Sequence, residues 1–391
     1  MRKHHLLGAI LLCGGLFSCS SEVIQQANYE IIPLPQEIKI STGNFVLNDR
    51  TSIVYPKGND EMQQNANLLA TYIRQMSGKK LKVIDEQITS NVITLTTGLN
   101  TDNAEAYQLK VTPDNIIIRG ASEAGTFYGI QTLRKSLPAT NKGDISLPGV
   151  EINDYPRFSY RGVHLDVSRH FFPIDSIKRF IDMMALHNIN RLHWHLTDDQ
   201  GWRIEIKKRP ELTTIGSKRS ATVIGHNSGE YDDVPYSGFY TQDEAKDIVR
   251  YAQERHITVI PEIDLPGHMQ AALAAYPELG CTGGPYEVWK MWGVSEDVLC
   301  AGNDKTLLFI EDVLSEMVDI FPSEYIHVGG DECPKIRWEK CPKCQARIKE
   351  LRLKADKNHT AEQKLQSYII NYAEQFLNGK GRRIIGWEEI L

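Results

Sequence analysis

Two adjacent carboxylates, Asp331 and Glu332, are the side chains of this chain best suited to do chemistry. They follow the apolar run 326–328 and the glycines Gly329 and Gly330. An apolar run that ends in two glycines is typical of a buried strand whose backbone turns sharply and comes close to a ligand. An acidic start of the next helix would explain one carboxylate, but not two. The pair is therefore predicted to be catalytic.

The residues after Tyr160 alternate strand-like and helix-like runs, which predicts βα units and a parallel sheet. One helix is expected from Pro173 to His187. Another is expected to start at a capping box of Thr241 and Glu244 and to run to Arg255. The expected strands are 162–167, 191–196, 258–263, 325–328 and 383–387. The first βα turn lacks a glycine-rich phosphate motif, which disfavours a nucleotide enzyme.

Polar or aromatic side chains follow every one of these strands. They are Asp166 and Arg169, Asp198 and Asp199, Asp264 and His268, Asp331 and Glu332, and Trp387 and Glu388. Because TIM barrels gather their functional groups at the carboxyl ends of the strands, this pattern predicts a TIM barrel. The alternation of His193, Trp194 and His195 places both histidines on one side of their strand, where barrel packing explains them as well as ligand binding does.

The predicted fold class is α/β, with a small N-terminal α+β domain at 29–150 and a catalytic domain at 155–391. In the first domain, two strands are expected around the turn 112–115 and a helix from Ser122. The stretch 137–149 is rich in turn-forming residues and is interpreted as a linker. Only about five of the eight strands of a (β/α)8 barrel are expected in this chain, so we expect a partial barrel, truncated at the C-terminus.

The 391 residues and 41% hydrophobic content are enough for about two domains. The net charge of −6 without a basic stripe argues against a nucleic-acid partner. Residues 1–19 have the basic start and short apolar run of an export signal. Their end resembles the lipobox of bacterial lipoproteins, with Cys19 as the lipid-bearing residue, which implies a protein anchored in the cell envelope, at the outer membrane or in the periplasm. An ordinary signal with an unrelated cysteine is the alternative.

Five further cysteines follow the signal: Cys281, Cys300, Cys333, Cys341 and Cys344. In an exported protein Cys281 and Cys300 are reasonable disulfide partners. The spacing of Cys341 and Cys344, with Cys333 nearby, also suits three ligands of a zinc knuckle, although no fourth ligand is evident. A local structural clip is favoured over a catalytic metal.

Several motifs together resemble the family-20 glycoside hydrolases, the exo-acting β-N-acetylhexosaminidases. The matching stretches are 160–170, 193–203, 261–268, 329–332 and 386–388, together with 105–137 in the smaller domain. The resemblance implies a retaining hydrolase of glycans that removes terminal β-linked GlcNAc or GalNAc without a metal or another cofactor. Two acids adjacent at a strand end diverge and cannot flank a glycosidic bond, so a substrate-assisted mechanism is expected.

The resemblance also implies roles for individual residues. Glu332 matches the general acid/base, and Asp331 matches the residue that orients the 2-acetamido group and stabilises an oxazolinium ion. The expected substrate-binding residues are Arg169 at the sugar hydroxyls, Asp198 and His268 in a chain toward Glu332, Asp264 on the same wall, and Trp387 at the acetamido methyl. Arg161, at the other end of its strand, is interpreted as structural.

Two other functions remain open from the sequence. A chain without the last barrel strands is expected to bind glycans weakly and to catalyse little, because positioning of the reacting groups contributes strongly to rate. A metal-dependent protein organised around Cys333, Cys341 and Cys344 would contain stoichiometric zinc and unfold with a chelator.

Overall fold

The structure is a computed structural model, and it describes residues 25–140 and 143–390. The predicted signal and Cys19 lie outside these residues. The chain divides into two compact units. The first includes residues up to 96 with 108–119 and 132–153, and the second includes 97–107, 120–131 and 154–391.

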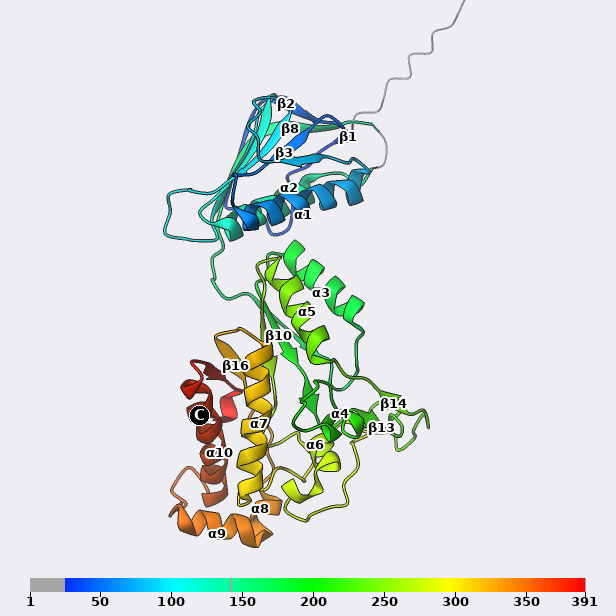
Figure 1. The fold of residues 1–391 in the computed structure, drawn as a ribbon, viewed down its shortest axis with the longest axis vertical. Coiled ribbons are helices and arrows are strands. Elements are labelled where there is room, and N and C mark those ends of the chain that lie inside the picture. Colours follow the sequence, from blue (N-terminus) through cyan, green and yellow to red (C-terminus); the bar gives the residue numbers. More distant parts are fainter. Residues whose placement is uncertain (1–24, 141–142, 391) are drawn as a thin grey trace, which may run out of the picture. The chain divides into compact units, whose positions relative to one another are not determined.

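The strands of one mixed sheet lie almost entirely in the first unit, in the order β1-β8-β6-β7-β5-β3-β4, with β2 paired to β8. The strands are β1 (Gln25–Gln26), β2 (Glu37–Leu47), β3 (Ser52–Val54), β4 (Lys82–Ile84), β5 (Val92–Thr96), β6 (Tyr107–Val111), β7 (Asn115–Gly120) and β8 (Ile145–Asp154). Helix α1 (Asp60–Ser77) contacts β3, β4 and β5 (Figure 1). Its first turn is capped by Asn59, whose side chain accepts a hydrogen bond from the Met62 amide.

The predicted strands around the turn 112–115 are confirmed as β6 and β7, and the predicted helix is α2 (Glu123–Ser136). The predicted linker at 137–149 is wrong, because its second half belongs to β8. Alternate side chains of β8, such as Leu147, are buried, and this burial outweighs the turn preference of Pro148. The proline is tolerated since it pairs with Asn44, where a bulge interrupts the ladder between β2 and β8.

The second unit is built on a parallel sheet in the order β17-β16-β15-β10-β9. Its strands are β9 (Gly162–Asp166), β10 (Arg191–His195), β15 (Thr258–Glu262), β16 (Tyr325–His327) and β17 (Arg383–Ile385). All five predicted strands are confirmed, with ends that differ by one or two residues. Each strand pairs with the next one in the sequence, and this is the winding of a βα barrel.

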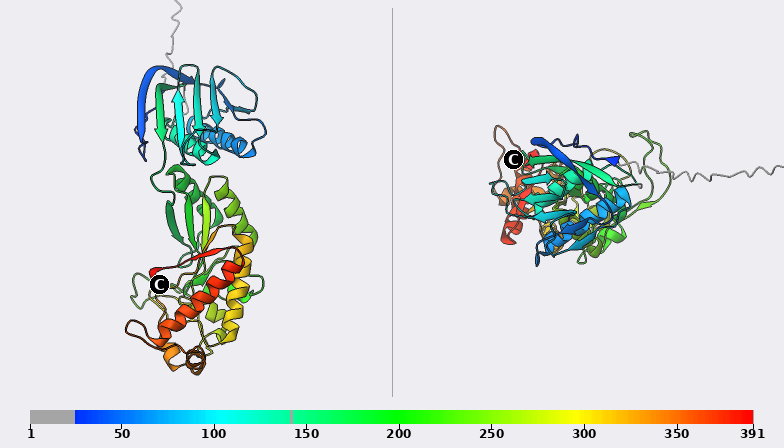
Figure 2. Two further views of the ribbon diagram at one scale, coloured as in Figure 1. Left: turned by 90° about the vertical axis from the view of Figure 1, so that its left-hand side faces the viewer. Right: turned by 90° about the horizontal axis from the view of Figure 1, so that it is seen from above.

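Helices connect these strands, and Figure 2 shows α7 and α10 beside the sheet. The longer helices are α3 (Ile174–Leu186), α5 (Gln242–Gln253), α7 (Asp304–Ile320), α9 (Pro342–Glu350) and α10 (Ala361–Gly379). The predicted capping box of Thr241 and Glu244 is confirmed at α5. Pro173 is the N-cap of α3 rather than its first helical residue, so the helix begins one residue later than predicted.

Shorter elements complete the unit. They are β11 (Thr197–Asp198), β12 (Gly201–Trp202), α4 (Glu211–Thr214), β13 (Lys218–Arg219), β14 (Tyr236–Ser237), α6 (Gln270–Ala275), η1 (Pro277–Leu279), α8 (Ile336–Lys340) and η2 (Glu388–Ile390). Within residues 25–140 and 143–390, every helix is too short or too polar to span a bilayer.

The alternation along β10 separates a packed side from a polar side. Trp194 is fully buried and its ring lies against Tyr240 and Phe321. His193 and His195 both reach the carboxylate of Glu262 on β15. The predicted common orientation of the two histidines is therefore confirmed, and their partner is a carboxylate of the neighbouring strand.

Candidate active site

The carboxyl ends of the parallel strands bring Asp331, Glu332 and His268 together. Nε2 of His268 lies 3.5 Å from Oε2 of Glu332 and 3.7 Å from Oδ2 of Asp331. The imidazole is buried, whereas the Glu332 side chain is 56% exposed and that of Asp331 is 27% exposed. The two carboxylates therefore converge on one nitrogen instead of diverging as neighbours on a regular strand would. Both remain open to a ligand from solvent.

The backbone after β16 explains this convergence. Gly329 and Gly330 have φ angles of 64° and 95°, and Glu332 itself has a φ of 45°. A Cβ atom at Gly329 would overlap the carboxylate of Asp264, and one at Gly330 would overlap Ile390. Only glycine fits both positions, as the sequence predicted. The left-handed conformation of Glu332 costs free energy, and it turns the side chain back toward His268.

Asp198 collects three cationic side chains at the end of β11. Its carboxylate lies 2.7 Å from Nη1 of Arg169, 2.8 Å from Nε2 of His195 and 3.1 Å from Nδ1 of His268. Burial of Asp198 would raise its pKa, but the contacts with His195 and His268 hold that pKa well below the usual range. Asp198 is therefore a buried carboxylate anion.

His268 is held as a cation by the same contacts. Burial lowers the pKa of an imidazole, but the contacts with Asp198 and with Asp199, 3.3 Å away, raise the pKa of His268 to about 12. An imidazolium donates from both ring nitrogens. One nitrogen faces the aspartates and the other faces the catalytic candidates, so His268 links the Asp198 anion to Glu332.

Glu262, which sequence reasoning did not single out, is the centre of a second buried network. Its carboxylate lies 2.5 Å from Nδ1 of His195, 2.7 Å from Nε2 of His193 and 3.0 Å from Nδ1 of His327. It also accepts a hydrogen bond of 3.1 Å from the indole of Trp387. Burial would raise the pKa of Glu262, but the charge and hydrogen bonds of these histidines lower it far below the usual range.

The two networks share His195, whose other ring nitrogen contacts Asp198. Burial lowers the pKa of His195, but the charge of Glu262 and the contacts with both carboxylates raise it well above the usual value. A sequence signal for Glu262 did exist, because a charged residue inside an apolar strand must find a partner. Opposite it, β10 offers two histidines on one face.

Asp264 lies behind the glycine turn and contacts the backbone of Gly330. Its Oδ1 accepts the Gly330 amide hydrogen bond at 3.1 Å. Burial raises the pKa of Asp264 well above the usual value, although the charge of His268 opposes the shift. Asp264 therefore supports the loop that carries Asp331, and it is itself 1% exposed.

Trp387 lies at the end of β17 with its ring against the histidines of the sheet. The ring centroids of Trp387 and His327 are 5.0 Å apart, and those of Trp387 and His193 are 5.7 Å apart. The indole is partly exposed, so it offers an apolar face at the same end of the sheet as Asp331.

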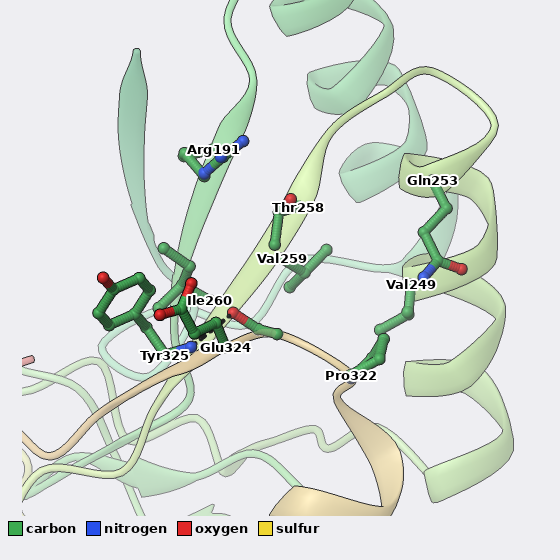
Figure 3. Close-up of a pocket in the computed structure, with 10 residues that line it drawn as sticks. Arg191, Val249, Gln253, Thr258, Val259, Ile260, Pro322, Glu324 and Tyr325 are labelled. Atoms are coloured by element: carbon green, nitrogen blue, oxygen red, sulfur yellow. Dashed lines mark hydrogen bonds between the residues drawn. The ribbon is translucent and has the colours of Figure 1, made fainter. Parts of the chain in front are cut away.

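Two cavities are lined by residues of this cluster. One of about 470 Å³ is lined by Arg169, Arg219 and Trp292, among others, and another of about 550 Å³ is lined by Glu332 and Lys335, among others. A third cavity of about 290 Å³ lies at the opposite ends of β10, β15 and β16, where Figure 3 shows Arg191, Thr258 and Tyr325 around it. The amino ends of barrel strands serve stability rather than chemistry, so the third cavity is not a candidate active site.

The structure also tests three predictions about residues outside this cluster. Arg161 pairs with Glu105 at 2.7 Å, at the amino end of β9, which agrees with its structural interpretation. The predicted Cys281–Cys300 disulfide is wrong, because both are free thiols that lie in one cluster with Cys341 and Cys344. Cys333 is outside this cluster, so the predicted zinc knuckle with Cys333 is wrong as well.

The fold and the site define a class of protein, namely a TIM-barrel-like α/β catalytic domain preceded by a smaller domain. Family models agree with this class. Residues 158–391 match the model of the glycosyl hydrolase family 20 catalytic domain, and residues 28–155 match that of glycosyl hydrolase family 20, domain 2. The chain belongs to glycosyl hydrolase family 20.

Individual relatives give the same result. The chain is 44% identical to a beta-hexosaminidase of Porphyromonas gingivalis, over 100% of this chain and 50% of that protein. It is 36% identical to a beta-hexosaminidase of Vibrio furnissii, over 93% of this chain and 57% of that protein. The chain thus spans about half the length of these relatives.

Solved structures share the fold. The crystal structure of a beta-N-acetylhexosaminidase from Bacteroides fragilis has a TM-score of 0.76 and 36% identity, and the match covers 92% of this chain and 66% of that one. The exo beta-N-acetylglucosaminidase from Vibrio harveyi, solved with N-acetylglucosamine, has a TM-score of 0.79 and 31% identity, covering 93% of this chain and 56% of that one.

Proposed function

We propose that this protein hydrolyses terminal, non-reducing β-linked N-acetylhexosamine from glycans with retention of configuration. The observation that carries the proposal is the convergence of Asp331 and Glu332 on one buried imidazolium at the carboxyl ends of parallel strands. The names of the relatives support the same activity. We also propose that the five parallel strands are part of a (β/α)8 barrel.

The reaction begins with the substrate's own acetamido group. Its carbonyl oxygen attacks C1, the bond from C1 to the leaving oxygen breaks, and Glu332 gives its proton to that oxygen. Asp331 accepts the acetamido N–H and stabilises the positive charge of the oxazolinium ion. Water then attacks C1, the bond from C1 to the acetamido oxygen breaks, and the water gives its proton to Glu332, which restores the acid. Two inversions at C1 retain the β configuration.

The buried network fixes the positions of the reacting groups. His268 faces both carboxylates, and Asp198 holds the other side of its ring. Arg169 is anchored through Nη1 to Asp198 and Asp166, which leaves the remaining donors of its guanidinium for sugar hydroxyls. Trp387 offers the apolar surface against which an acetamido methyl can pack.

The test is hydrolysis of a chromogenic aryl β-GlcNAc by the full-length natural protein. We expect Glu332→Gln to lower kcat/KM by about 10²-fold or more, which is the usual contribution of a general acid. The matched control is Glu324→Gln, an exposed glutamate at the opposite end of the sheet that pairs with Arg383; it should retain wild-type activity. The corresponding aryl β-glucoside, which lacks the acetamido nucleophile, should not be cleaved.

Two results would contradict this function. Equal cleavage of the glucoside would exclude a substrate-assisted reaction. Full activity of Glu332→Gln on a substrate with a poor leaving group would remove the general acid from the proposal. An inactive wild-type protein that still binds GlcNAc would instead favour a glycan-binding role.

We also propose export and lipid anchoring through Cys19, on the sequence of residues 1–19. In the producing bacterium, the wild-type protein should incorporate labelled fatty acid and Cys19→Ser should not. Release of an unlabelled wild-type protein into the soluble fraction would indicate an ordinary cleaved signal.

A further inference from the structure

Four cysteines from three separate segments meet in the second unit, away from the candidate active site. They are Cys281 after η1, Cys300 before α7, and Cys341 and Cys344 at the start of α9. Their sulfur atoms all lie within 4.8 Å of one another. Cys300, Cys341 and Cys344 are buried and Cys281 is partly buried. The proposed hydrolysis does not use this group.

The distances between the sulfurs fit one shared ion. Sγ of Cys300 lies 3.7 Å from that of Cys341 and 3.6 Å from that of Cys344, and Sγ of Cys281 lies 3.8 Å from that of Cys344. A tetrahedral zinc with bonds of about 2.3 Å has sulfur–sulfur edges of about 3.8 Å. A disulfide requires about 2.05 Å, and no pair of these four thiols is bonded.

The local backbone is arranged to bring the four sulfurs together. Cys341 is the N-cap of α9 and Cys344 follows three residues later, so the two side chains lie on one side of the helix start. A Cβ atom at Gly302 would overlap the backbone of Lys343 and Cys344, which shows how closely the two segments approach.

We propose that Cys281, Cys300, Cys341 and Cys344 bind one structural zinc ion through four thiolates. All four tetrahedral positions are then occupied by protein, so the ion has no open position for a substrate or a water. Binding exchanges the thiol protons for the metal and releases them to solvent. No oxidant is needed. This inference does not depend on the proposed hydrolase activity.

The ion would join two segments that border the candidate active site. The loop 281–300 returns to the site. There the backbone amide of Trp289 donates to the Asp199 carbonyl oxygen, and the side-chain amide of Gln200 donates to the Met291 carbonyl oxygen. Helices α8 and α9, drawn in orange in Figure 1, follow the loop of Glu332. Zinc would therefore hold together the two ends of the loop, Cys281 and Cys300, and this loop carries Trp292, which lines a cavity together with Arg169.

The first experiment measures metal content in the full-length protein, purified without a metal-affinity step. We expect one zinc per chain by mass spectrometry, and no measurable zinc in Cys281→Ser or Cys344→Ser. The matched control is Cys333→Ser, because Cys333 is a buried cysteine outside the cluster; it should retain one zinc. A wild-type protein without zinc, or Cys333→Ser without zinc, would overturn the assignment.

A second experiment remains decisive if the serine variants do not fold. Cobalt is exchanged into the wild-type protein, and a tetrathiolate site should give the intense visible absorption of tetrahedral Co²⁺. Under denaturing conditions without a reductant, the four cysteines should be alkylated once a chelator has removed the metal. If they are alkylated only after reduction, they form disulfides and the zinc proposal is wrong. Loss of zinc with unchanged aryl β-GlcNAc hydrolysis would leave the proposed function intact.

Discussion

Replacement of Asp198 by asparagine tests the link from Asp198 through His268 to Glu332 with almost no change in side-chain shape. The wild-type carboxylate is buried and faces Arg169, His195 and His268 within 3.1 Å. The amide carries no charge and replaces one acceptor oxygen with a donor. The three cations then lose the anion that they share, and His268 loses the contact that raises its pKa most strongly.

The expected magnitude follows from burial. Removing one partner of a buried ion pair costs roughly 3–5 kcal/mol because a charge stays buried without compensation. Arg169 is 26% exposed, so water screens part of this loss, and we expect a decrease of about 3 kcal/mol in the free energy of unfolding. The loss of orientation at His268 should lower kcat/KM by about 10²-fold, equivalent to about 2.7 kcal/mol in the transition state.

The assay combines urea unfolding with the pH profile of kcat/KM on an aryl β-GlcNAc, in the full-length protein. The matched control is Asp182→Asn, which breaks the 2.7 Å ion pair between Asp182 on α3 and Arg255, two residues after the end of α5. The control should lose stability and keep the wild-type pH profile. If Asp198→Asn keeps both the wild-type rate and the wild-type profile, the link from Asp198 through His268 to Glu332 does not serve the reaction.

Two further predictions concern the glycine turn and the pH dependence of stability. Gly329→Ala should destabilise the protein by more than about 3 kcal/mol in urea unfolding, because its Cβ would overlap Asp264 at a φ of 64°. The control is Gly58→Ala, which has a φ of 76° and open space around the new Cβ, and which should cost only about 1 kcal/mol. The pKa of Asp198 is lowered from 3.8, so its contribution to the free energy of unfolding is present above pH 3.8 and is lost as the pH falls further. The pKa of His268 is raised from 6.5 to about 12, so its contribution to the free energy of unfolding is complete below pH 6.5 and is lost as the pH rises. Between pH 7 and 9, the free energy of unfolding of the wild-type protein should therefore fall by up to about 1.4 kcal/mol per pH unit through His268, and His268→Asn should lose this fall. Identical pH slopes for the wild type and His268→Asn would contradict the raised pKa.

The parallel sheet was predictable because its strands carry local signals. Apolar runs such as 325–328 and 258–263 have the length of strands, and polar residues follow each of them. β8 was missed because Pro148 and Gly149 are turn formers when considered alone. Pairing with β2 and the bulge opposite Pro148 decide its structure, and both depend on a strand about 100 residues earlier.

The candidate site likewise contains residues that the sequence predicted and residues that it did not. Asp331, Glu332 and His268 were found because each lies in a short, specific motif, and the structure brings them together. The centre at Glu262 was missed because its partners His193, His195 and His327 come from other strands. The cysteine cluster was misassigned for the same reason. Spacing along the chain suggested Cys333 as the neighbour of Cys341 and Cys344, whereas the fold brings Cys281 and Cys300 to them.

The left-handed conformations at the end of the sheet also limit how this site can change by mutation. His268 and Glu332 have φ angles of 52° and 45°, next to Gly329 and Gly330 in the same region of backbone space. Each such residue is a local instability that the remaining packing must offset. Substitutions elsewhere that weaken the packing should therefore disturb the positions of His268 and Glu332 before they unfold the domain. A designer who transfers Asp331 and Glu332 to another barrel has to transfer the turn that precedes them as well.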